Sequence, residues 1–268
     1  MTSVLDLKSA LNFAQNLAQS VGEKLLAMQN NVSVVAFKER QDMVTTADYA
    51  AEKLYLKAIH HQYPDHSIHS EEQGSDQKKS DYQWIIDPLD GTKEYLRGIP
   101  LWNTNLTLEL HRRPILSVIY KPDLKVLFAA TKVVGVLENG RQTKLSTIKS
   151  LSQSHIYAYL PSQASVFQPL AKPWQKMAQL SQQTYRLRGS SEEVVSIAWV
   201  AIGKIEAAVN FCRFPQWYDF ASGLVCAQTA GCRVTDLNNQ PIDSRGQYQG
   251  YIISNGLIHQ AIIDSITA

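Results

Sequence analysis

Apolar and polar positions follow a helical period at the start of the chain. From Val4 to Met28, apolar residues recur at steps of three and four, which predicts an amphipathic helix with one buried face. A second helix is expected to begin at Thr45, because Thr45 and Asp48 fit a capping box, and Pro64 marks its end. The apolar stripe of this second helix is expected to comprise Ala47, Ala51, Leu54 and Ala58.

The middle of the chain has the shorter period of β-strands. Residues 103–110 (NTNLTLEL) alternate between polar and apolar, with their three leucines on one face. Two more apolar runs, PILSVIY and KVLFAA, lie on either side of KPDL, which has the composition of a turn. Asn139-Gly140 then predicts a tight hairpin. We expect an antiparallel sheet that packs against the first two helices.

The last third of the chain alternates between short strand-like runs and helical patterns. The strand-like runs are HIYAY, TYRLR, IEAAV and GYIIS. The helical patterns cover approximately residues 167–182, 191–202, 219–230 and 257–266. Such alternation is typical of an α/β arrangement. We therefore expect an N-terminal part (residues 1–150) of helices and antiparallel sheet and a C-terminal α/β part (residues 151–268), joined as one compact unit with a cleft between them.

Composition and charge narrow the classes of function. The chain has 268 residues, a net charge of +2 and no dense basic run, so a nucleic-acid partner is not expected. No apolar run is long enough to cross a membrane, and the N-terminus MTSVLDLKSA lacks the pattern of a signal peptide. Three cysteines without C-x-x-C spacing indicate reduced thiols rather than a disulfide framework or a zinc site. These features favour a cytoplasmic protein.

The segment WIIDPLDGT (84–92) places two acidic side chains where a buried strand must stop. Its proline removes a backbone donor and its glycine allows a sharp bend, so the strand cannot simply continue. Asp87, Asp90 and the carbonyl oxygen of Leu89 can supply three of the oxygen ligands that Mg²⁺ requires. Thr92 can start a helix whose free N–H groups would attract an anion. Cation ligands and a phosphate cradle would then share one turn.

An ordinary surface turn is the alternative interpretation, since all these residue types favour turns. Two carboxylates at the end of a buried strand need a compensating partner, however, and that favours a cation site. Other acids have equally plain interpretations when taken alone: Asp48 and Asp219 as helix caps, and Glu71 as a solvated acid. We favour a functional role for Glu71, Asp87, Asp90 and Asp219.

Six segments occur in the order expected for one known family. They are VTTADYAAE at 44–52, SEEQG at 70–74, WIIDPLDGT at 84–92, the hairpin GVLENGRQTKLS, LRGSSEEVVSIAWVAIGKIEAAV, and WYDFASG at 217–223. Together they resemble the inositol monophosphatase superfamily, whose members are Mg²⁺-dependent, Li⁺-sensitive phosphomonoesterases with an αβαβα layered fold. The resemblance implies this mixed α+β and α/β sandwich, a small phosphorylated substrate and Mg²⁺ as the cofactor, and it suggests a homodimer.

The resemblance also implies a role for each site residue. The ligands of two or three Mg²⁺ ions would be Glu71, Asp87, Asp90, Asp219 and the carbonyl oxygen of Leu89. Glu71 and Thr92 would position and activate a metal-bound water, and Asp48 would orient Thr92 through a hydrogen bond. The N–H groups of Gly91 and Thr92 would hold phosphate oxygens. These roles are chemically coherent, because two metals can activate water and neutralise the leaving group.

The chain departs from the family pattern near three of these segments. Tyr218 stands directly before the last aspartate, where tryptophan is usual, and Trp217 lies one residue earlier, which leaves the packing of that helix start open. The loop RQDMVTTAD lacks the usual Ser-Pro or Asp-Pro before its threonine, which affects a loop associated with a third, weaker metal. Ser70 replaces a glycine that is common before the paired glutamates.

Substrate preference is the least constrained property. TKEYLRG and RGSS (188–191) resemble the 3′(2′),5′-bisphosphate nucleotidase branch, which favours hydrolysis of adenosine 3′,5′-bisphosphate to AMP. The expected substrate-binding residues are Arg188, Gly189, Ser190 and Arg213. Glu192 and Glu193 stand where that branch often has lysine, which should weaken binding of a second phosphate. The alternatives are inositol 1-phosphate, a sugar bisphosphate, or a role in a transcription complex, as some bacterial members of the family have.

Overall fold

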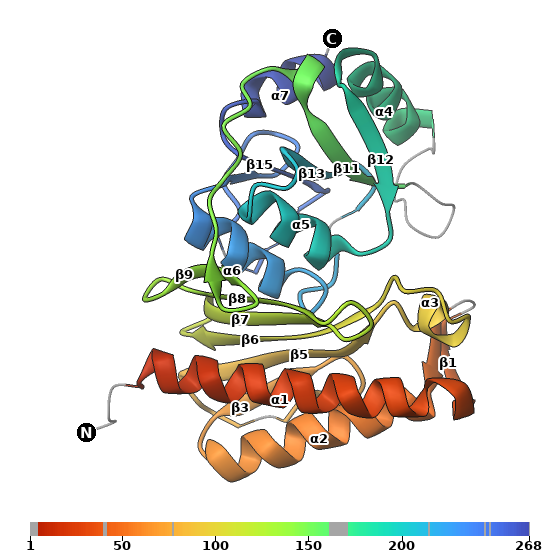
Figure 1. Ribbon diagram of the computed structural model, residues 1–268, viewed down its shortest axis with the longest axis vertical. Helices are drawn as coiled ribbons and strands as arrows, with labels where there is room; N and C mark the ends of the chain where they lie inside the picture. The colour runs from red at the N-terminus through yellow and green to blue at the C-terminus, as the bar shows by residue number, and fades with distance from the viewer. Residues whose placement is uncertain are drawn as a thin grey trace.

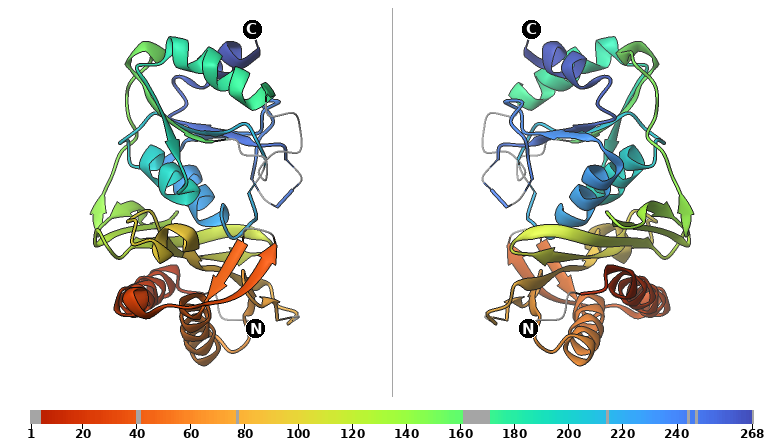
Figure 2. Two further views of the ribbon diagram at one scale, coloured as in Figure 1. Left: turned by 90° about the vertical axis from the view of Figure 1, so that its right-hand side faces the viewer. Right: turned by 90° about the vertical axis from the view of Figure 1, so that its left-hand side faces the viewer.

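The computed structural model stacks helices and sheets in five layers (Figures 1 and 2). It describes residues 5–39, 42–76, 78–160, 171–213, 215–243, 245–246 and 248–267. From the bottom of Figure 1 upwards, the layers are a helix pair, a sheet, a second helix pair, a second sheet and a third helix pair. The αβαβα sandwich expected from the sequence is therefore confirmed.

The first layer consists of α1 (Leu7–Met28) and α2 (Thr46–Gln62), which cover the outer face of the larger sheet. The capping box predicted for α2 is present, with Thr45 as N-cap and Asp48 as its partner. The predicted apolar stripe of α2 is wrong at Leu54, which is exposed. The buried face instead includes Asp48 and Glu52. A pattern that counts only apolar residues leaves out these two acids and therefore assigns the wrong face of the helix to the core. Val4 lies outside the described residues.

The larger sheet has eight strands in the order β10-β9-β8-β7-β6-β5-β3-β4. Their bounds are Ser67–Ser70 (β3), Gly74–Ser75 (β4), Tyr82–Asp90 (β5), Asn103–Leu110 (β6), Arg113–Lys121 (β7), Val126–Thr131 (β8), Gly135–Glu138 (β9) and Arg141–Gln142 (β10). The pairing is antiparallel as expected, except that β3 runs parallel to β5. Positive φ angles of 48° at Asn139 and 77° at Gly140 confirm the predicted hairpin turn.

The remaining short elements are a strand pair, a short helix and two 3₁₀ turns. The strands β1 (Val34–Glu39) and β2 (Asp42–Thr45) pair with each other, and α3 (Thr92–Leu96) follows β5. Two 3₁₀ turns cover Gln29–Asn31 and Leu151–Gln153. The strand β2 leads directly into α2, so the part of the RQDMVTTAD loop that the structure describes is extended chain; residues 40–41 lie outside the described part.

The second sheet has five strands in the order β12-β11-β13-β15-β14. Their bounds are His155–Tyr159 (β11), Arg186–Ser190 (β12), Ala207–Asn210 (β13), Arg233–Thr235 (β14) and Tyr251–Ser254 (β15). Helices α5 (Glu193–Ala201) and α6 (Ala221–Ala230) lie between the two sheets, while α4 (Ala171–Gln183) and α7 (His259–Thr267) cover the outer face (Figure 1). All four predicted helices are present, although residues 167–170 of the first lie outside the described part. A division of the chain near residue 150 stays a prediction.

Both faces of the larger sheet are covered, which has a direct consequence for β6. Leu106 and Leu108 pack towards α1 and α2 as expected. The polar residues that alternate with them, including Asn103, Asn105 and Glu109, are also at most 1% exposed, because α5 and α6 cover the other face. These polar side chains must therefore find partners inside the molecule.

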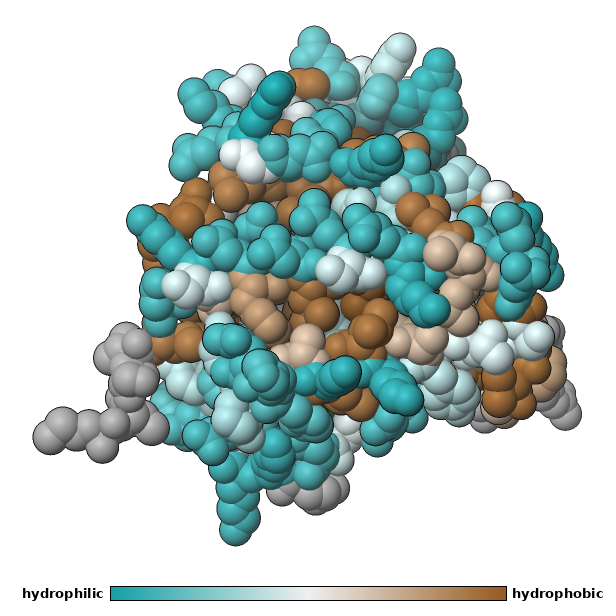
Figure 3. Space-filling model, turned by 60° about the horizontal axis from the view of Figure 1, so that its bottom comes forward, coloured by the Kyte–Doolittle hydropathy of each residue, from teal (hydrophilic) through white to brown (hydrophobic). Residues whose placement is uncertain are grey.

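The outer surface of the first layer carries a hollow of about 370 Å³ between α1 and α2, lined by Phe13, Leu17 and Leu54 among others. Figure 3 turns this side of the molecule towards the viewer and shows apolar side chains gathered between bands of hydrophilic ones. No helix in the described part of the chain has the length and apolar character that a membrane span requires.

Candidate active site

The turn that ends β5 has a backbone shape which only glycine permits. The pairing of β5 with β6 shifts between Asp87 and Asp90, and the N–H of Leu89 donates to Asp87 Oδ1 at 3.1 Å. Gly91 has a φ of 88°, and a β-carbon there would lie 2.5 Å from the carbonyl oxygen of Leu101. Helix α3 starts at the next residue, Thr92, as predicted. The backbone is thus bent sharply between the two aspartates and the helix.

The four predicted acids gather in one region. Burial raises the pKa of Asp87 well above its usual value. The negative charges that raise it further are those of Glu71, Asp90 and Asp219. The pKa of Asp219 is raised in the same way, first by burial and then by Asp90 and Glu71. The structure therefore brings together carboxylates that are far apart in the sequence: Glu71 and Asp219 are separated by 148 positions.

This donor set fits a hard divalent cation. Several buried carboxylates that raise one another's pKa are costly unless a positive charge balances them. All the candidate donors are oxygen atoms, which is the donor type that Mg²⁺ prefers. Among the described residues, no three His, Cys, Asp or Glu side chains already form a metal-binding group. The fit therefore rests on charge, burial and donor chemistry.

Asp48 and Thr92 meet as predicted. The Thr92 hydroxyl lies 3.1 Å from Asp48 Oδ1 and 3.1 Å from the carbonyl oxygen of Leu89, either of which can accept its proton. The other oxygen of Asp48 accepts the N–H of Thr45 at 2.8 Å and its hydroxyl at 2.5 Å. Asp48 thus caps α2 with one oxygen and faces the turn with the other.

A chain of polar side chains that the sequence motifs do not indicate supports Asp90. Asn103 Nδ2 donates to Asp90 Oδ2 at 2.7 Å, Asn105 Nδ2 donates to Asn103 Oδ1 at 3.3 Å, and Ser222 Oγ donates to Asn105 Oδ1 at 2.9 Å. Burial raises the pKa of Asp90 to about 7 even though Asn103 opposes the shift, and nearby acids including Glu192 add to it. Two asparagines at the start of a core strand were the available signal.

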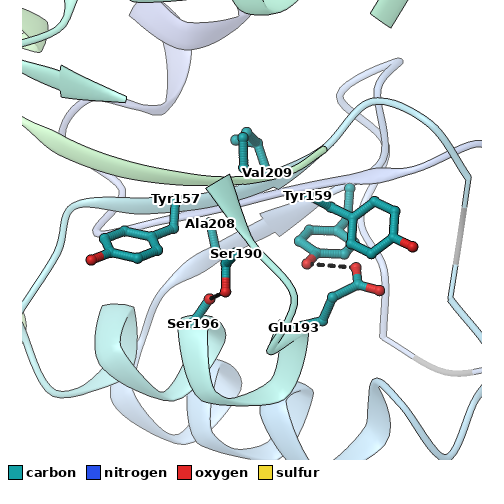
Figure 4. A pocket seen from close by; sticks show the side chains of 9 residues that line it. Tyr157, Tyr159, Ser190, Glu193, Ser196, Ala208 and Val209 are labelled. Carbon is teal, nitrogen blue, oxygen red and sulfur yellow. Dashed lines mark hydrogen bonds between the residues drawn. The ribbon is translucent and has the colours of Figure 1, made fainter. Parts of the chain in front are cut away.

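The start of α5 holds two buried glutamates, each with its own partners. Glu192 forms an ion pair with Lys121, whose side chain is 2% exposed. Glu193 Oε1 accepts from Asn210 Nδ2 at 2.8 Å and from the Tyr251 hydroxyl at 3.0 Å. Glu193 reaches from α5 towards the second sheet, beside a hydrogen bond between Ser190 and Ser196 (Figure 4).

The predicted substrate-binding residues fall into two groups. Arg213 stacks over Tyr159 at 5.8 Å, and its charge acts on Asp219 and Glu193. Arg188 is exposed on the edge strand β12, and no ion pair joins it to Asp87, Asp90 or Asp219 among the described residues.

The other two predicted residues lie next to Arg188. Gly189 packs against Leu160, where a β-carbon would come within 2.5 Å of a side-chain atom. The Ser190 hydroxyl accepts from the N–H of Glu192 at 3.1 Å and from Ser196 at 2.8 Å, so it already has partners. Of the four, Arg213 is thus the one that the structure brings to the carboxylates.

Trp217 fixes the segment that carries Asp219. Its indole N–H donates to the buried Glu109 at 2.5 Å, and Arg245 donates to the same carboxylate at 3.0 Å. Trp217 also packs in the core between the sheets, although it stands one residue earlier than the family pattern expects. The segment is therefore anchored on β6 despite the changed position. Phe214 lies outside the described residues.

Comparison with known proteins agrees with this geometry. The profile of the inositol monophosphatase family matches residues 6–268. Nus factor SuhB of Pseudomonas aeruginosa is 30% identical over 86% of each chain, and an inositol-1-monophosphatase of Synechocystis sp. is 29% identical over 98% of this chain and 90% of the relative. The structure of an IMPase from Thermotoga maritima matches with a TM-score of 0.85 and 25% identity over 97% of both chains. The chain therefore belongs to the inositol monophosphatase family and is a phosphatase that hydrolyses phosphoric monoesters.

Proposed function

We propose that this phosphatase acts on the monophosphate of an uncharged polyol, with inositol 1-phosphate as the first compound to test. This choice differs from adenosine 3′,5′-bisphosphate, which TKEYLRG and RGSS favoured. The observation that supports it is the charge at the start of α5. Glu192 and Glu193 both raise the pKa of Asp90, so their negative charges act on the metal side of the site. A second phosphate there would have to take a cation away from one of these glutamates, whereas a hydroxyl group would need none.

The nearby cations are already engaged by these two glutamates. Lys121 is bound to Glu192 and to the carbonyl oxygens of Pro100 and Trp102. The positive charge of Arg213 is balanced by Glu193, whose carboxylate raises the pKa of Arg213. A bisphosphate would have to compete with these buried carboxylates for either cation. Arg213 remains the residue best suited to contact the leaving group of the substrate.

The residues of the chain have defined parts in the proposed reaction. Mg²⁺ would be held by Glu71, Asp87, Asp90, Asp219 and the carbonyl oxygen of Leu89. Bound Mg²⁺ would supply Lewis-acid chemistry that neutralises phosphate charge and favours ionisation of the attacking water. The Thr92 hydroxyl donates a hydrogen bond to Asp48, so its oxygen would be able to accept one from that water, and Glu71 would be the second group that positions the water. The N–H groups of Gly91 and Thr92 would donate to phosphate oxygens.

The test measures phosphate release from inositol 1-phosphate, adenosine 3′,5′-bisphosphate and fructose 1,6-bisphosphate, with Mg²⁺ and with or without Li⁺. Glu193→Gln removes a charge but keeps an oxygen that Asn210 and Tyr251 can reach. We expect it to shift the kcat/KM ratio towards the bisphosphates, while the matched variant Glu206→Gln leaves the ratio unchanged. An unchanged ratio in Glu193→Gln would remove the charge argument. Activity that survives in Asp90→Asn would remove the metal assignment.

A second role is suggested by a relative's name. The Pseudomonas aeruginosa protein is described as a Nus factor, so a role of this chain in a transcription complex is a separate proposal. Its test is complementation of a deletion strain with the Asp90→Asn variant. If this inactive variant restores a transcription phenotype, the role does not depend on hydrolysis. If only the active enzyme restores it, hydrolysis is the function that matters. A homodimer also stays a prediction.

A further inference from the structure

Helix α2 carries a second buried acid one turn beyond Asp48. Glu52 is 0% exposed, and because it follows Asp48 by four positions it lies on the same face of the helix. Its Oε1 accepts the hydroxyl of Ser70 at 2.5 Å and the N–H of Gln73 at 3.1 Å. These two partners stand on either side of Glu71 and Glu72 in the sequence. Glu52 therefore bridges the two ends of the turn that presents Glu71.

The same turn is held from its other side. The N–H of Glu71 donates to the carbonyl oxygen of Ile86 at 3.1 Å, and Ile86 directly precedes Asp87. The backbone around Glu71 is thus fixed both to α2, through Glu52, and to β5. Ser70 is the residue that replaces a common glycine, and its hydroxyl supplies a contact that glycine lacks.

We propose that Glu52 is a positioning residue that holds Glu71 in place for Mg²⁺ and the attacking water. Helix α2 would then orient both water-positioning groups, Thr92 through Asp48 and Glu71 through Glu52. The second oxygen of Glu52, Oε2, is buried and has no hydrogen-bond partner in the described part of the chain. A buried acid with one unsatisfied oxygen is costly for stability alone, which favours a role at the site. The inference rests on the proposed metal-dependent hydrolysis.

The chain offers a matched control for this acid. Glu206 is also buried, at 4% exposure, and its carboxylate also accepts a serine hydroxyl and a backbone N–H, from Ser146 and His155, each at 2.7 Å. It directly precedes β13, whereas Asn210 beside Glu193 ends that strand, so it lies at the opposite end from the site. Removing Glu206 should disturb the fold to a similar degree without reaching Glu71.

The experiment compares Glu52→Ala, Glu52→Gln, Ser70→Ala and Glu206→Ala in the full chain. Mg²⁺ affinity is measured by calorimetry with the metal alone, and kcat with inositol 1-phosphate at saturating Mg²⁺. We expect Glu52→Ala to weaken Mg²⁺ binding by about 10- to 100-fold, the range for residues that support metal ligands. Glu52→Gln keeps the Oε1 acceptor and should stay within about threefold of the wild type, with Ser70→Ala between them.

Several results would overturn the proposal. Wild-type Mg²⁺ affinity in Glu52→Ala would do so, as would an equal loss in Glu206→Ala. If Glu52→Ala does not fold, wild-type affinity in Ser70→Ala would count against the role in its place. Failure of the proposed function looks different, because the wild type would then bind Mg²⁺ but not hydrolyse inositol 1-phosphate. The Mg²⁺ titrations would still test Glu52 in that case.

Discussion

Replacing Lys121 with methionine tests how the two halves of the site are joined. The side chains of Lys121 and Glu192 are 2% and 4% exposed, and they pair between the end of β7 and the start of α5. Lys121 Nζ also donates to the carbonyl oxygens of Pro100 at 3.3 Å and Trp102 at 3.1 Å. Methionine keeps most of the aliphatic volume but removes the charge and all three interactions.

The expected loss follows from the burial of Glu192. Removing one member of a buried ion pair leaves an uncompensated charge and costs about 3–5 kcal/mol. Total stabilities of domains are about 5–15 kcal/mol, so Lys121→Met should remove about a fifth or more of the free energy of unfolding. Burial raises the pKa of Glu192, and Lys121 is the main opposing influence. Without Lys121 the pKa rises further, so the loss should be larger at pH 8 than at pH 5.

Urea unfolding of four proteins measures this coupling: the wild type, Lys121→Met, Glu192→Gln and the double variant. We expect the double variant to be more stable than Lys121→Met by about 2 kcal/mol, since no charge is then left unpaired. A loss below about 1 kcal/mol in Lys121→Met would refute the reasoning, because an exposed pair costs that little. Losses that simply add in the double variant would refute it as well.

Three further predictions concern the turn itself. Thr92→Val should lower kcat about 100-fold or more and cost about 1 kcal/mol of stability. Thr45→Ala should cost a similar free energy but lower kcat by at most about tenfold. Equal losses of kcat in the two variants would contradict the role of Thr92 at the water. Gly91→Ala should destabilise the protein by more than about 1 kcal/mol in thermal unfolding, because of its φ of 88° and the 2.5 Å approach, and Gly98→Ala, which has open space around it, should cost less. In EDTA, the free energy of unfolding should fall as pH rises from about 4 towards 7. The reason is that Asp90 has a pKa of about 7 in the folded protein and so keeps a proton that the unfolded chain loses near 3.8. A flat profile, or one that is unchanged in Asp90→Asn, would contradict this.

Local sequence signals predicted the elements that depend on neighbouring residues. The capping box of Thr45 and Asp48, the Asn139-Gly140 hairpin and the start of α3 after Gly91 all arise within a few positions. They could be predicted because residue type and spacing alone decide their geometry.

Contacts between distant segments were beyond sequence reasoning. Lys121 and Glu192 are separated by 71 positions, and Glu52 and Ser70 by 18, so nothing local indicates that they meet. At Leu54 the local pattern gave the wrong answer: this apolar residue is exposed, while Asp48 and Glu52 lie on the buried face of α2. The resemblance to a family supplied the expected metal ligands and drew attention to Glu192 and Glu193, but the partners of these two glutamates required the packed structure.

The central proposal is that an acidic metal site, flanked by two buried glutamates that engage the nearby cations, selects an uncharged leaving group. The direct measurement is kcat/KM of the wild type with Mg²⁺ for inositol 1-phosphate and for adenosine 3′,5′-bisphosphate under the same conditions. We expect inositol 1-phosphate to be preferred by about tenfold or more, which corresponds to about 1.4 kcal/mol of transition-state stabilisation. A preference of that size for the bisphosphate would contradict it.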